Sequence, residues 1–441
     1  MLHFISLGCP RNLVDTEVML GIAKRHGYDF TDRIEAAQYI VINTCGFLKS
    51  ARQEACDVLK EVFAEKRADA KVIVAGCMVK EYRGHLRELF PEIYYFIGSG
   101  NVDSILEALS SATSGECVTG TSYLQKKGEE RLLSTPGHYA YLKVAEGCLK
   151  RCTYCSIPTI KGALVSRKVE DVKEEFSSLL DRGIFEVILI AQDLGDFGKD
   201  KKDKTENVKS LIGALLKDPR EFWLRLMYIY PDEIDDELID LIDSDDRICN
   251  YLDMPIQHAD DEILKRMGRK TSRAEIEEVI AKLRSRIPDM VIRTSLITGF
   301  PGETEAQHLV LKEFIEEQKL DNIGIFKYSQ EAFTLAAKFE GQIEEKEKER
   351  RYNELMEAQQ QIAININGGL IGYQIPVVID SIEEDVLVAR TYGQCPDVDG
   401  TVLISNIDID YDIITGQICL AEIREVDGYD LIADIIEVFE D

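Results

Sequence analysis

Short apolar runs, each followed by an amphipathic segment, recur along the first part of the chain. The runs cover residues 2–7, 39–42 and 71–75, and the helix-like segments cover residues 12–26, 49–66 and 79–90. Strands and helices that alternate in this way predict a parallel sheet with helices on both faces. We therefore expect an N-terminal α/β domain over residues 1–115.

The alternation resumes after residues 116–137, a polar, turn-rich stretch that we interpret as a linker. Strand candidates cover residues 139–145, 185–191, 222–228, 249–254, 290–297 and 322–328. Helix candidates cover residues 169–182, 210–217, 233–244, 273–286 and 304–319. Six strand-helix units predict a partial (βα)6 barrel of the triose-isomerase type over residues 138–340.

The pattern changes again after residue 340. Residues 344–361 read as a charged helix with few apolar positions, typical of a solvated connector, which we place at 341–370. Five short strand candidates follow, at residues 377–379, 386–390, 402–404, 414–423 and 431–438. They predict a small five-stranded barrel of the oligonucleotide-binding (OB) kind over residues 371–441. The fold class is therefore α/β, with a β-barrel at the C-terminal end.

The charge of the chain is distributed unevenly. The whole chain of 441 residues carries a formal charge of −28, and residues 371–441 contain seventeen acidic residues against two arginines. An acidic surface repels phosphate, so direct RNA binding is not expected. A negative surface also favours solubility, but the concentration of charge in one domain favours a docking surface for a basic partner.

The cysteine content and the apolar runs bear on the compartment. Eleven cysteines in a long chain that shows no signal peptide favour metal ligands and free thiols over a disulfide framework. No apolar run approaches the roughly 20 residues of a membrane span. We therefore expect a cytoplasmic protein with no membrane partner.

Three cysteines, Cys148, Cys152 and Cys155, follow the strand candidate 139–145 in one short segment. We call them the central cysteines. Thiolates select iron-sulfur clusters, zinc or copper(I), and a structural zinc site would need a fourth ligand from elsewhere in the chain. Three thiolates on a four-iron cluster leave one iron open to bind a small molecule, which indicates catalysis rather than simple electron transfer.

A second set, Cys9, Cys45 and Cys77, lies directly after the three strand candidates of the first domain. We call them the N-terminal cysteines. Because the carboxyl ends of parallel strands share one edge of a sheet, these thiols can converge despite their separation in sequence. The alternative is that each is an ordinary buried cysteine.

Other polar residues fall at or near the predicted strand ends. His258 is a candidate ligand or proton carrier, or else a wall residue with its hydrogen bonds satisfied. Arg225 and Arg293 lie within apolar strands, where they need either a substrate carboxylate or an internal ion pair. Residues 298–304 predict a tight turn into a helix with a capping box at Thr304 and Gln307.

With these motifs in place, the chain resembles the methylthiotransferases of the radical S-adenosylmethionine superfamily along essentially its whole length. The Cys-x3-Cys-x2-Cys spacing of the central cysteines is that superfamily's signature. Residues 6–15 (SLGCPRNLVD), 43–47 (NTCGF) and 76–77 resemble the family's auxiliary-cluster domain, and the tail resembles its TRAM domain. Three stretches resemble most the members that modify an aspartate of the small-subunit ribosomal protein numbered twelve: residues 191–193 (AQD), 251–258 (YLDMPIQH) and 390–400 (RTYGQCPDVDG).

The resemblance implies a cofactor set. The central cysteines would hold a 4Fe-4S cluster whose open iron binds S-adenosylmethionine, and the N-terminal cysteines would hold an auxiliary 4Fe-4S cluster that carries the sulfur to be methylated and delivered. A second S-adenosylmethionine would supply the methyl group. Tyr154, Gln192 and Arg293 are the implied contacts to S-adenosylmethionine, and an electron donor is required. No residue is assigned a further catalytic role.

The resemblance also implies the substrate, the β-carbon of an aspartate in a basic ribosomal protein of the small subunit, free or on the ribosome. One alternative is a sister enzyme that methylthiolates an adenosine beside a tRNA anticodon, which the acidic tail disfavours. A second is an iron-sulfur scaffold without catalysis, although electron carriers normally close their clusters with four cysteines. One departure is Lys161-Gly162, where the family commonly has Arg-Gly, so a bidentate contact there is in doubt.

Overall fold

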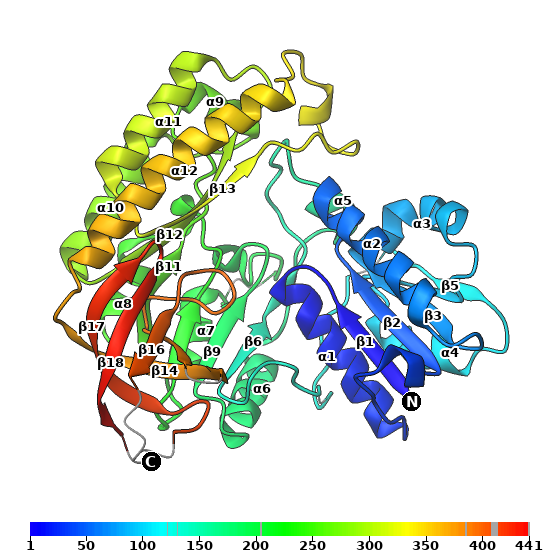
Figure 1. The fold of residues 1–441 in the computed structure, drawn as a ribbon. Helices are drawn as coiled ribbons and strands as arrows, with labels where there is room; N and C mark the ends of the chain where they lie inside the picture. The colour runs from blue at the N-terminus through cyan, green and yellow to red at the C-terminus, as the bar shows by residue number, and fades with distance from the viewer. Residues whose placement is uncertain (121, 130, 203–204, 384–385, 407–412, 440–441) are drawn as a thin grey trace.

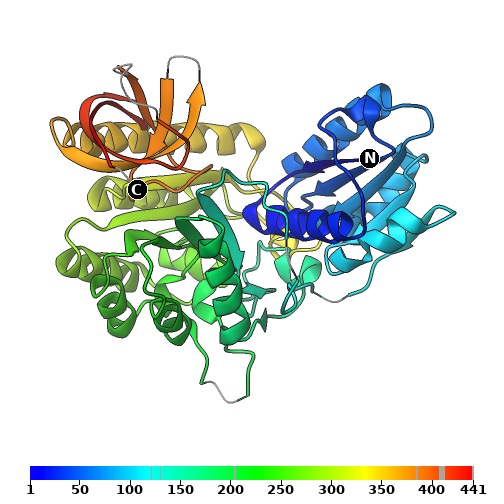
Figure 2. The ribbon, with the colours of Figure 1, turned by 90° about the horizontal axis from the view of Figure 1, so that it is seen from below.

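The computed structural model describes residues 1–120, 122–129, 131–202, 205–383, 386–406 and 413–439. Residues 121 and 130 of the predicted linker, and 384–385, 407–412 and 440–441 of the predicted last domain, lie outside the described residues. Figures 1 and 2 show the N-terminal sheet and the C-terminal strands on either side of a central sheet. Of the helices in the described part of the chain, none has the length and hydropathy to cross a bilayer.

The N-terminal domain is a five-stranded parallel sheet in the order β1-β2-β3-β4-β5. Its strands are β1 (Leu2–Ser6), β2 (Tyr39–Thr44), β3 (Lys71–Gly76), β4 (Tyr95–Gly98) and β5 (Gly115–Cys117). Its helices are α1 (Pro10–Arg25), α2 (Lys49–Glu65), α3 (Cys77–Leu89) and α4 (Ile105–Ser110). Helices α1 and α4 pack on one face, and α2 and α3 pack on the other. The expected sheet covered on both faces is confirmed.

Strand β1 forms an isolated parallel bridge in addition to its pairing with β2. Leu2 pairs in parallel with Phe30 on one side of β1, and β1 pairs with β2 on the other side. The chain therefore leaves β1 in one direction and returns to cross to its opposite side. In open α/β sheets, a strand from which the chain crosses over to both sides has a crevice at its carboxyl end, and ligands bind in this crevice.

Part of the stretch interpreted as a linker is integrated into the fold. β5 adds to the edge of the N-terminal sheet, and Tyr123 is buried against α1 and the first sheet. Arg131 is also buried and forms ion pairs with Glu17 of the first domain and Glu175 of the central one. A three-residue edge strand is too short to show a period of two, so the pattern could not reveal it.

The central domain contains the six predicted parallel strands in one open sheet, in the order β13-β12-β11-β10-β9-β6. The strands are β6 (Tyr139–Lys143), β9 (Glu186–Ile190), β10 (Trp223–Leu226), β11 (Ile248–Asp253), β12 (Val291–Thr298) and β13 (Asn322–Lys327). A short ribbon, β7 (Ala145–Glu146) with β8 (Val165–Ser166), follows β6. The helices are α5 (Ile157–Ile160), α6 (Val169–Asp181), α7 (Val208–Leu215), α8 (Asp236–Asp243), α9 (Asp261–Met267), α10 (Arg273–Arg286) and α11 (Glu305–Gln318). The predicted partial barrel is confirmed.

Helix α9 is absent from the sequence-based prediction. Asp260 caps its first turn by accepting from the amide of Ile263, and Gly268 ends it in the left-handed conformation at φ 78°. Both residues are standard start and stop signals. The helix has only seven residues, which is too short for an apolar period to stand out.

The last unit is a closed five-stranded barrel in the order β14-β15-β16-β18-β17. Its strands are β14 (Gln374–Glu383), β15 (Val386–Arg390), β16 (Val402–Asn406), β17 (Ile418–Asp427) and β18 (Asp430–Val438). The connector helix α12 (Glu345–Gly368) runs beside α11 before it reaches this barrel (Figure 1). The expected small barrel is confirmed.

The loop between β15 and β16 fills the concave face of the central sheet. Cys395 is buried there among Tyr141, Ile188 and Tyr251. The hydroxyl of Tyr251 in β11 donates to Asp399 of this loop at 2.7 Å. This hydrogen bond attaches the loop of the last barrel to the central sheet. The inner face of the six strands is occupied by this chain's own loop.

Arg390, at the end of β15, anchors this arrangement. Its guanidinium lies 2.9 Å from Glu186 of β9 and 2.5 Å from Asp380 of β14, and the side chain is buried. Burial alone would raise the pKa of Glu186, but Arg225 and Arg390 together hold it below its ordinary value. The carboxylate therefore stays charged inside the protein because two arginines surround it.

We expect Arg390→Ala to destabilise the packing of the last barrel by about 3 kcal/mol, because removing one partner leaves a buried charge short of compensation. Hydrogen exchange of the backbone amides of β14 and β15, recorded at increasing urea concentration, measures this loss of stability. Arg424→Ala is the matched control, because Arg424 is exposed and pairs with Glu422 and Asp434 on the barrel surface. Equal effects of the two substitutions would contradict the assignment.

Candidate active site

The loop that carries the central cysteines begins after β6 and is held on both sides. Gly147 has a φ of 77°, and a Cβ there would lie 2.1 Å from the carbonyl oxygen of Ala163, so only glycine fits. Farther along the loop, the amide of Thr153 donates to the carbonyl of Met267 at 2.9 Å. The backbone therefore sets where the three thiols lie.

The central thiols lie close enough to influence one another's ionisation. Burial raises the pKa of Cys148 to about 11 and that of Cys155 to about 12, and the charge of Cys152 contributes to both rises. The amide of Lys150 donates to Sγ of Cys148 at 3.3 Å, which favours the thiolate. Buried thiolates need a nearby positive charge such as a metal cluster supplies, so these residues fit a three-thiolate cluster.

The N-terminal cysteines meet at the crevice of the first sheet. Cys9 follows β1, Cys45 follows β2, and Cys77 opens α3 directly after β3. A Cβ on Gly8 would lie 2.6 Å from Cβ of Cys45, which shows how closely the first two loops approach. Burial raises the pKa of Cys77 to about 12, and the charges of Cys9 and Cys45 raise it further. These thiols come together as expected, and they too fit a three-thiolate cluster.

A cavity of about 370 Å³ lies between the two domains. Cys148 and Cys155 line it from the central domain, and Arg11, Phe47 and Leu48, which follow Cys9 and Cys45 in the chain, line it from the first. The guanidinium of Arg11 donates to the carbonyl of Ala191 at 2.7 Å, which fixes the first domain against β9. Two central cysteines and residues close in sequence to Cys9 and Cys45 therefore border the same cavity.

Two of the three predicted cofactor contacts line this cavity, namely Tyr154 and Gln192. Gln192 donates through Nε2 to Glu146, whereas its Oε1 has no hydrogen-bond partner among the described residues. Tyr154 packs against the cluster of apolar side chains around Met267 and Phe300. The free amide oxygen and the tyrosine ring are suited to a polar ligand with a flat aromatic part.

Arg293 lies elsewhere. Its guanidinium pairs with Asp253 at 3.1 Å and with Asp399 of the inserted loop at 3.2 Å. Ser295 and Ile297, farther along β12, line the cavity, whereas Arg293 does not. Arg225 likewise pairs with Glu186 at 2.5 Å. The sequence left two explanations for Arg225 and Arg293, a substrate carboxylate or an internal ion pair. In the structure, internal ion pairs compensate both charges.

A buried group of four charges joins the two cysteine sets. Lys143 contacts Asp15 and Glu146, and Lys161 contacts the same two carboxylates, at 3.2 Å from Asp15 and 3.4 Å from Glu146. Asp15 lies six residues after Cys9, Glu146 two before Cys148, and Lys161 six after Cys155. The lysine at the family's usual arginine position thus engages two carboxylates as a point charge.

A second group of acids surrounds Lys150. Asp193, Asp196 and Glu233 direct carboxylate oxygens to one spot, and the ammonium of Lys150 lies 2.7 Å from Glu233 and 3.5 Å from Asp193. Burial and the neighbouring Asp196 raise the pKa of Asp193 to about 7. The ammonium group compensates the acids and ties the cysteine loop to the end of β9.

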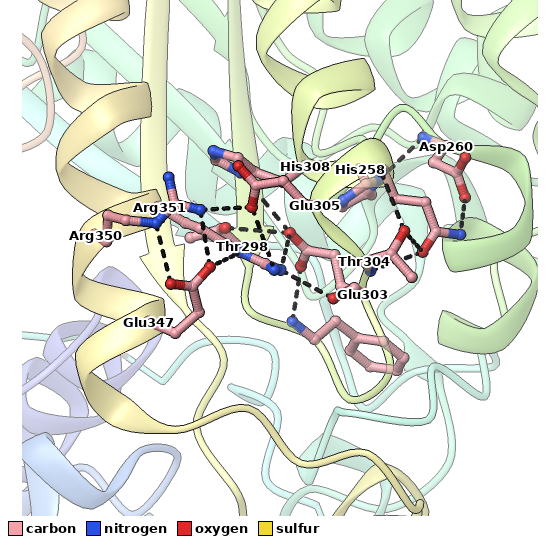
Figure 3. Close-up of polar contacts among 12 residues, drawn as sticks. His258, Asp260, Thr298, Glu303, Thr304, Glu305, His308, Glu347, Arg350 and Arg351 are labelled. Atoms are coloured by element: carbon pink, nitrogen blue, oxygen red, sulfur yellow. Dashed lines mark hydrogen bonds and ion pairs between the residues drawn. The ribbon is translucent and has the colours of Figure 1, made fainter.

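His258 belongs to a structural network rather than to the cavity wall (Figure 3). It is fully buried, its Nδ1 accepts from the amide of Asp260 at 3.0 Å, and burial lowers its pKa to about 3. In the same network Glu303 pairs with Arg351 at 3.1 Å, and the predicted capping box at Thr304 is confirmed. His258 is therefore a neutral residue that holds the turn before α9.

Sequence reasoning missed Tyr228 in the cavity wall, and it did not predict the unusual backbone of Tyr228 and Gln257. Tyr228 and Gln257 line the cavity with φ angles of 63° and 74°, which are rare for residues other than glycine. Such strained backbone is concentrated at functional sites. No local signal marks these positions, because the strain is imposed by the surrounding structure.

A loop after β13 holds the two domains together across the cavity. Glu331 accepts from the amide of Lys49, the first residue of α2, at 2.9 Å and from Arg52 at 2.7 Å. The guanidinium of Arg52 stacks 4.4 Å from the ring centre of Tyr82. Helix α2, which begins just after Cys45, is thus capped by a residue of the central domain.

Comparison with known proteins gives three domain matches. Residues 1–98 match the uncharacterized protein family UPF0004, residues 142–315 match the radical SAM superfamily, and residues 371–436 match the TRAM domain. A solved structure of the radical S-adenosylmethionine methyltransferase TsrM from Kitasatospora setae, with tryptophan substrate and an S-adenosylmethionine analogue bound, has a similar fold. Its TM-score is 0.55 at 16% identity, over 87% of this chain and 79% of that one.

Relatives match over nearly their whole length. The ribosomal protein uS12 methylthiotransferase RimO of Protochlamydia amoebophila is 49% identical over 99% of this chain and 92% of that protein. RimO of Chlamydia abortus is 46% identical over 99% of this chain and 95% of that protein. The radical SAM match implies S-adenosylmethionine and a 4Fe-4S cluster. The chain therefore belongs to the RimO family of methylthiotransferases in the radical SAM superfamily.

Proposed function

We propose that this enzyme inserts a methylthio group on the β-carbon of an aspartate in the small-subunit ribosomal protein twelve, with two 4Fe-4S clusters and S-adenosylmethionine. The observation that carries the proposal is the shared cavity. Cys148 and Cys155 line it on one side, and on the other side it is lined by residues that directly follow Cys9 and Cys45. A carbon held in this space would be within reach of both cysteine sets.

In this proposal the central cysteines hold the cluster that works on S-adenosylmethionine, and the N-terminal cysteines hold the auxiliary cluster. The cofactors supply the difficult chemistry, which is one-electron cleavage of S-adenosylmethionine, hydrogen abstraction and delivery of methylated sulfur. The donor sets support both assignments, because each is a group of three buried or half-buried thiols with no fourth cysteine assigned to it.

The protein's own residues bind and orient the reactants. The free amide oxygen of Gln192 would accept a hydrogen bond from S-adenosylmethionine, and the ring of Tyr154 would pack against its adenine. Tyr228, Tyr230 and Tyr328 complete an aromatic wall that excludes water from the reacting atoms. Arg293 has no place in this set, because its charge is already compensated by two aspartates.

The charge distribution supports a basic protein substrate. The last domain carries a net charge of −15 from seventeen acidic residues and two arginines. Long-range attraction to such a surface speeds the capture of a basic ribosomal protein and opposes the capture of tRNA. The curated relatives are named for the ribosomal protein uS12, which agrees with this choice.

Mass spectrometry tests the substrate directly. The reconstituted enzyme is incubated with S-adenosylmethionine, sulfide and a reductant, either with the ribosomal protein or with bulk tRNA. We expect the mass of one added methylthio group on an aspartate-containing peptide of the protein and none on tRNA. The same incubation with the Cys152→Ala enzyme is the blank. A gain on tRNA alone would replace the substrate assignment with the sister activity.

A further inference from the structure

The cavity between the domains is lined by two cationic side chains, Arg11 and Lys327, and by no Asp or Glu among the described residues. Lys327 is already paired, because its ammonium lies 3.1 Å from Glu345 and also contacts Glu349, both on α12. Across the described ranges, Arg11 has no carboxylate oxygen within the 4.0 Å of an ion pair. Of the two cations, Arg11 is therefore the one whose charge is open to a ligand in the cavity.

Two contacts with the central domain hold Arg11 in place. The residue belongs to the first turn of α1, which lies on the side of the N-terminal domain that faces the central sheet (Figure 1). One terminal nitrogen donates to the carbonyl of Ala191 at 2.7 Å, and the guanidinium lies 5.2 Å from the ring centre of Tyr228. Tyr228 has the unusual φ of 63°. The strained tyrosine and the carbonyl thus fix the arginine at the cavity wall.

Arg11 keeps N–H donors for such a ligand. A guanidinium binds a carboxylate through two parallel N–H donors in a planar geometry, and it carries enough donors to bind a carbonyl as well. The carbonyl of Ala191 is its one hydrogen-bond acceptor among the residues that the structure describes. A carboxylate, which accepts hydrogen bonds and carries a negative charge, is the chemical group that matches the rest of this side chain.

The guanidinium lies between the two halves of the proposed reaction site. Ala191, its acceptor, directly precedes Gln192, whose Oε1 has no partner in the described part of the chain and is assigned to S-adenosylmethionine. Arg11 itself is the second residue after Cys9. The cavity reaches the surface beside β13, where Phe326 lines it and is 46% exposed. A substrate side chain that binds Arg11 would lie between the cofactor contact and the N-terminal cysteines.

We propose that Arg11 determines substrate specificity by binding the side-chain carboxylate of the substrate aspartate. The inference rests on the proposed function, in which the β-carbon of that aspartate reacts. The β-carbon is bonded directly to the carboxylate carbon, so an arginine that holds the carboxylate also positions the reacting carbon. An asparagine at the same place would lose the charge and one acceptor oxygen. A glutamate bound through its carboxylate would present its γ-carbon instead.

A double-mutant cycle tests this pairing. The parent and Arg11→Gln enzymes, both reconstituted anaerobically, are titrated by calorimetry with the ribosomal protein that carries either its target aspartate or an asparagine in that place. S-adenosylmethionine is present and no reductant is added, so that no turnover occurs. We expect Arg11→Gln to weaken binding of the aspartate form about tenfold or more and to change binding of the asparagine form by less than about twofold. A general disturbance of the site would weaken both forms equally.

Three further variants sharpen the comparison. Arg11→Lys keeps the charge but loses the bidentate geometry, so its affinity for the aspartate form should fall between those of the parent and Arg11→Gln. Lys327→Gln removes the other cation of the cavity and should show no selective loss for the aspartate form, because Lys327 already pairs with two glutamates. Arg33→Gln is the matched control, because Arg33 is exposed in the same domain and pairs with Glu35. It should bind both forms as the parent does.

Iron content and the Kd of S-adenosylmethionine are measured in the same enzymes. Equal losses for the two substrate forms in Arg11→Gln would overturn the assignment, and so would a selective loss in Lys327→Gln in its place. Loss of iron or of S-adenosylmethionine affinity in Arg11→Gln, without a selective loss for the aspartate form, would assign the guanidinium to a cluster or to the cofactor's own carboxylate. Failure of the parent enzyme to bind the aspartate form would instead count against the proposed function.

Discussion

Replacing Cys152 with alanine will abolish the formation of 5′-deoxyadenosine from S-adenosylmethionine. The cluster that performs this cleavage is assigned to three thiolates, and the loop that carries them is fixed by Gly147 and by the backbone contact to Met267. Chromatographic measurement of 5′-deoxyadenosine with dithionite as the reductant checks this expectation.

Cys56→Ala is the control for this experiment, because Cys56 is a buried cysteine within α2 that belongs to neither set. It should cleave S-adenosylmethionine at close to the parent rate. Persistent cleavage by the Cys152→Ala enzyme, at iron content equal to the parent, would refute the assignment of the central cluster.

The second large effect is expected from the triple substitution of Cys9, Cys45 and Cys77 by alanine. The parent enzyme, reconstituted anaerobically, should bind about eight irons, and the triple variant about four. Cleavage of S-adenosylmethionine should persist, because the central cysteines are untouched. Insertion of the methylthio group should be lost, because the auxiliary site would carry no sulfur. Iron and sulfide analysis together with product mass spectrometry measures both parts.

Cys117→Ala serves as the control here, because Cys117 lies in edge strand β5 and accepts hydrogen bonds from Asn101 and Ser104. It should retain about eight irons. A parent enzyme with about four irons, unchanged in the triple variant, would remove the auxiliary cluster from the proposal.

Much of the fold was predictable because its signals are local. Each strand of the central sheet is a short apolar run buried by helices, and the C-terminal strands alternate between turn signals. The cysteine positions were predictable for a related reason. Parallel strands place their carboxyl ends on one edge, so residues that directly follow three such strands must approach one another.

The contacts between domains were not predictable in this way. Nothing near Arg293 in sequence shows that Asp399, in a loop of another domain, reaches its guanidinium. The same holds for Glu331, which caps α2 across nearly three hundred residues, and for Lys161, which shares Asp15 and Glu146 with Lys143. A substrate carboxylate and an internal aspartate can each compensate the charge of a buried arginine. Only the distances between side chains in the folded structure distinguish these two explanations.

The amino-acid sequence was enough to identify the two sets of three cysteines, the strand-helix order that brings Cys9, Cys45 and Cys77 to one sheet edge, and the acidic last domain. These properties depend on residue type and on short-range periodicity. Two features came to light only with the folded structure: the cavity that Cys148 and Cys155 share with residues near Cys9 and Cys45, and the β15–β16 loop on the inner face of the central sheet. These depend on how whole domains pack, which is set by many weak contacts between residues far apart in the chain.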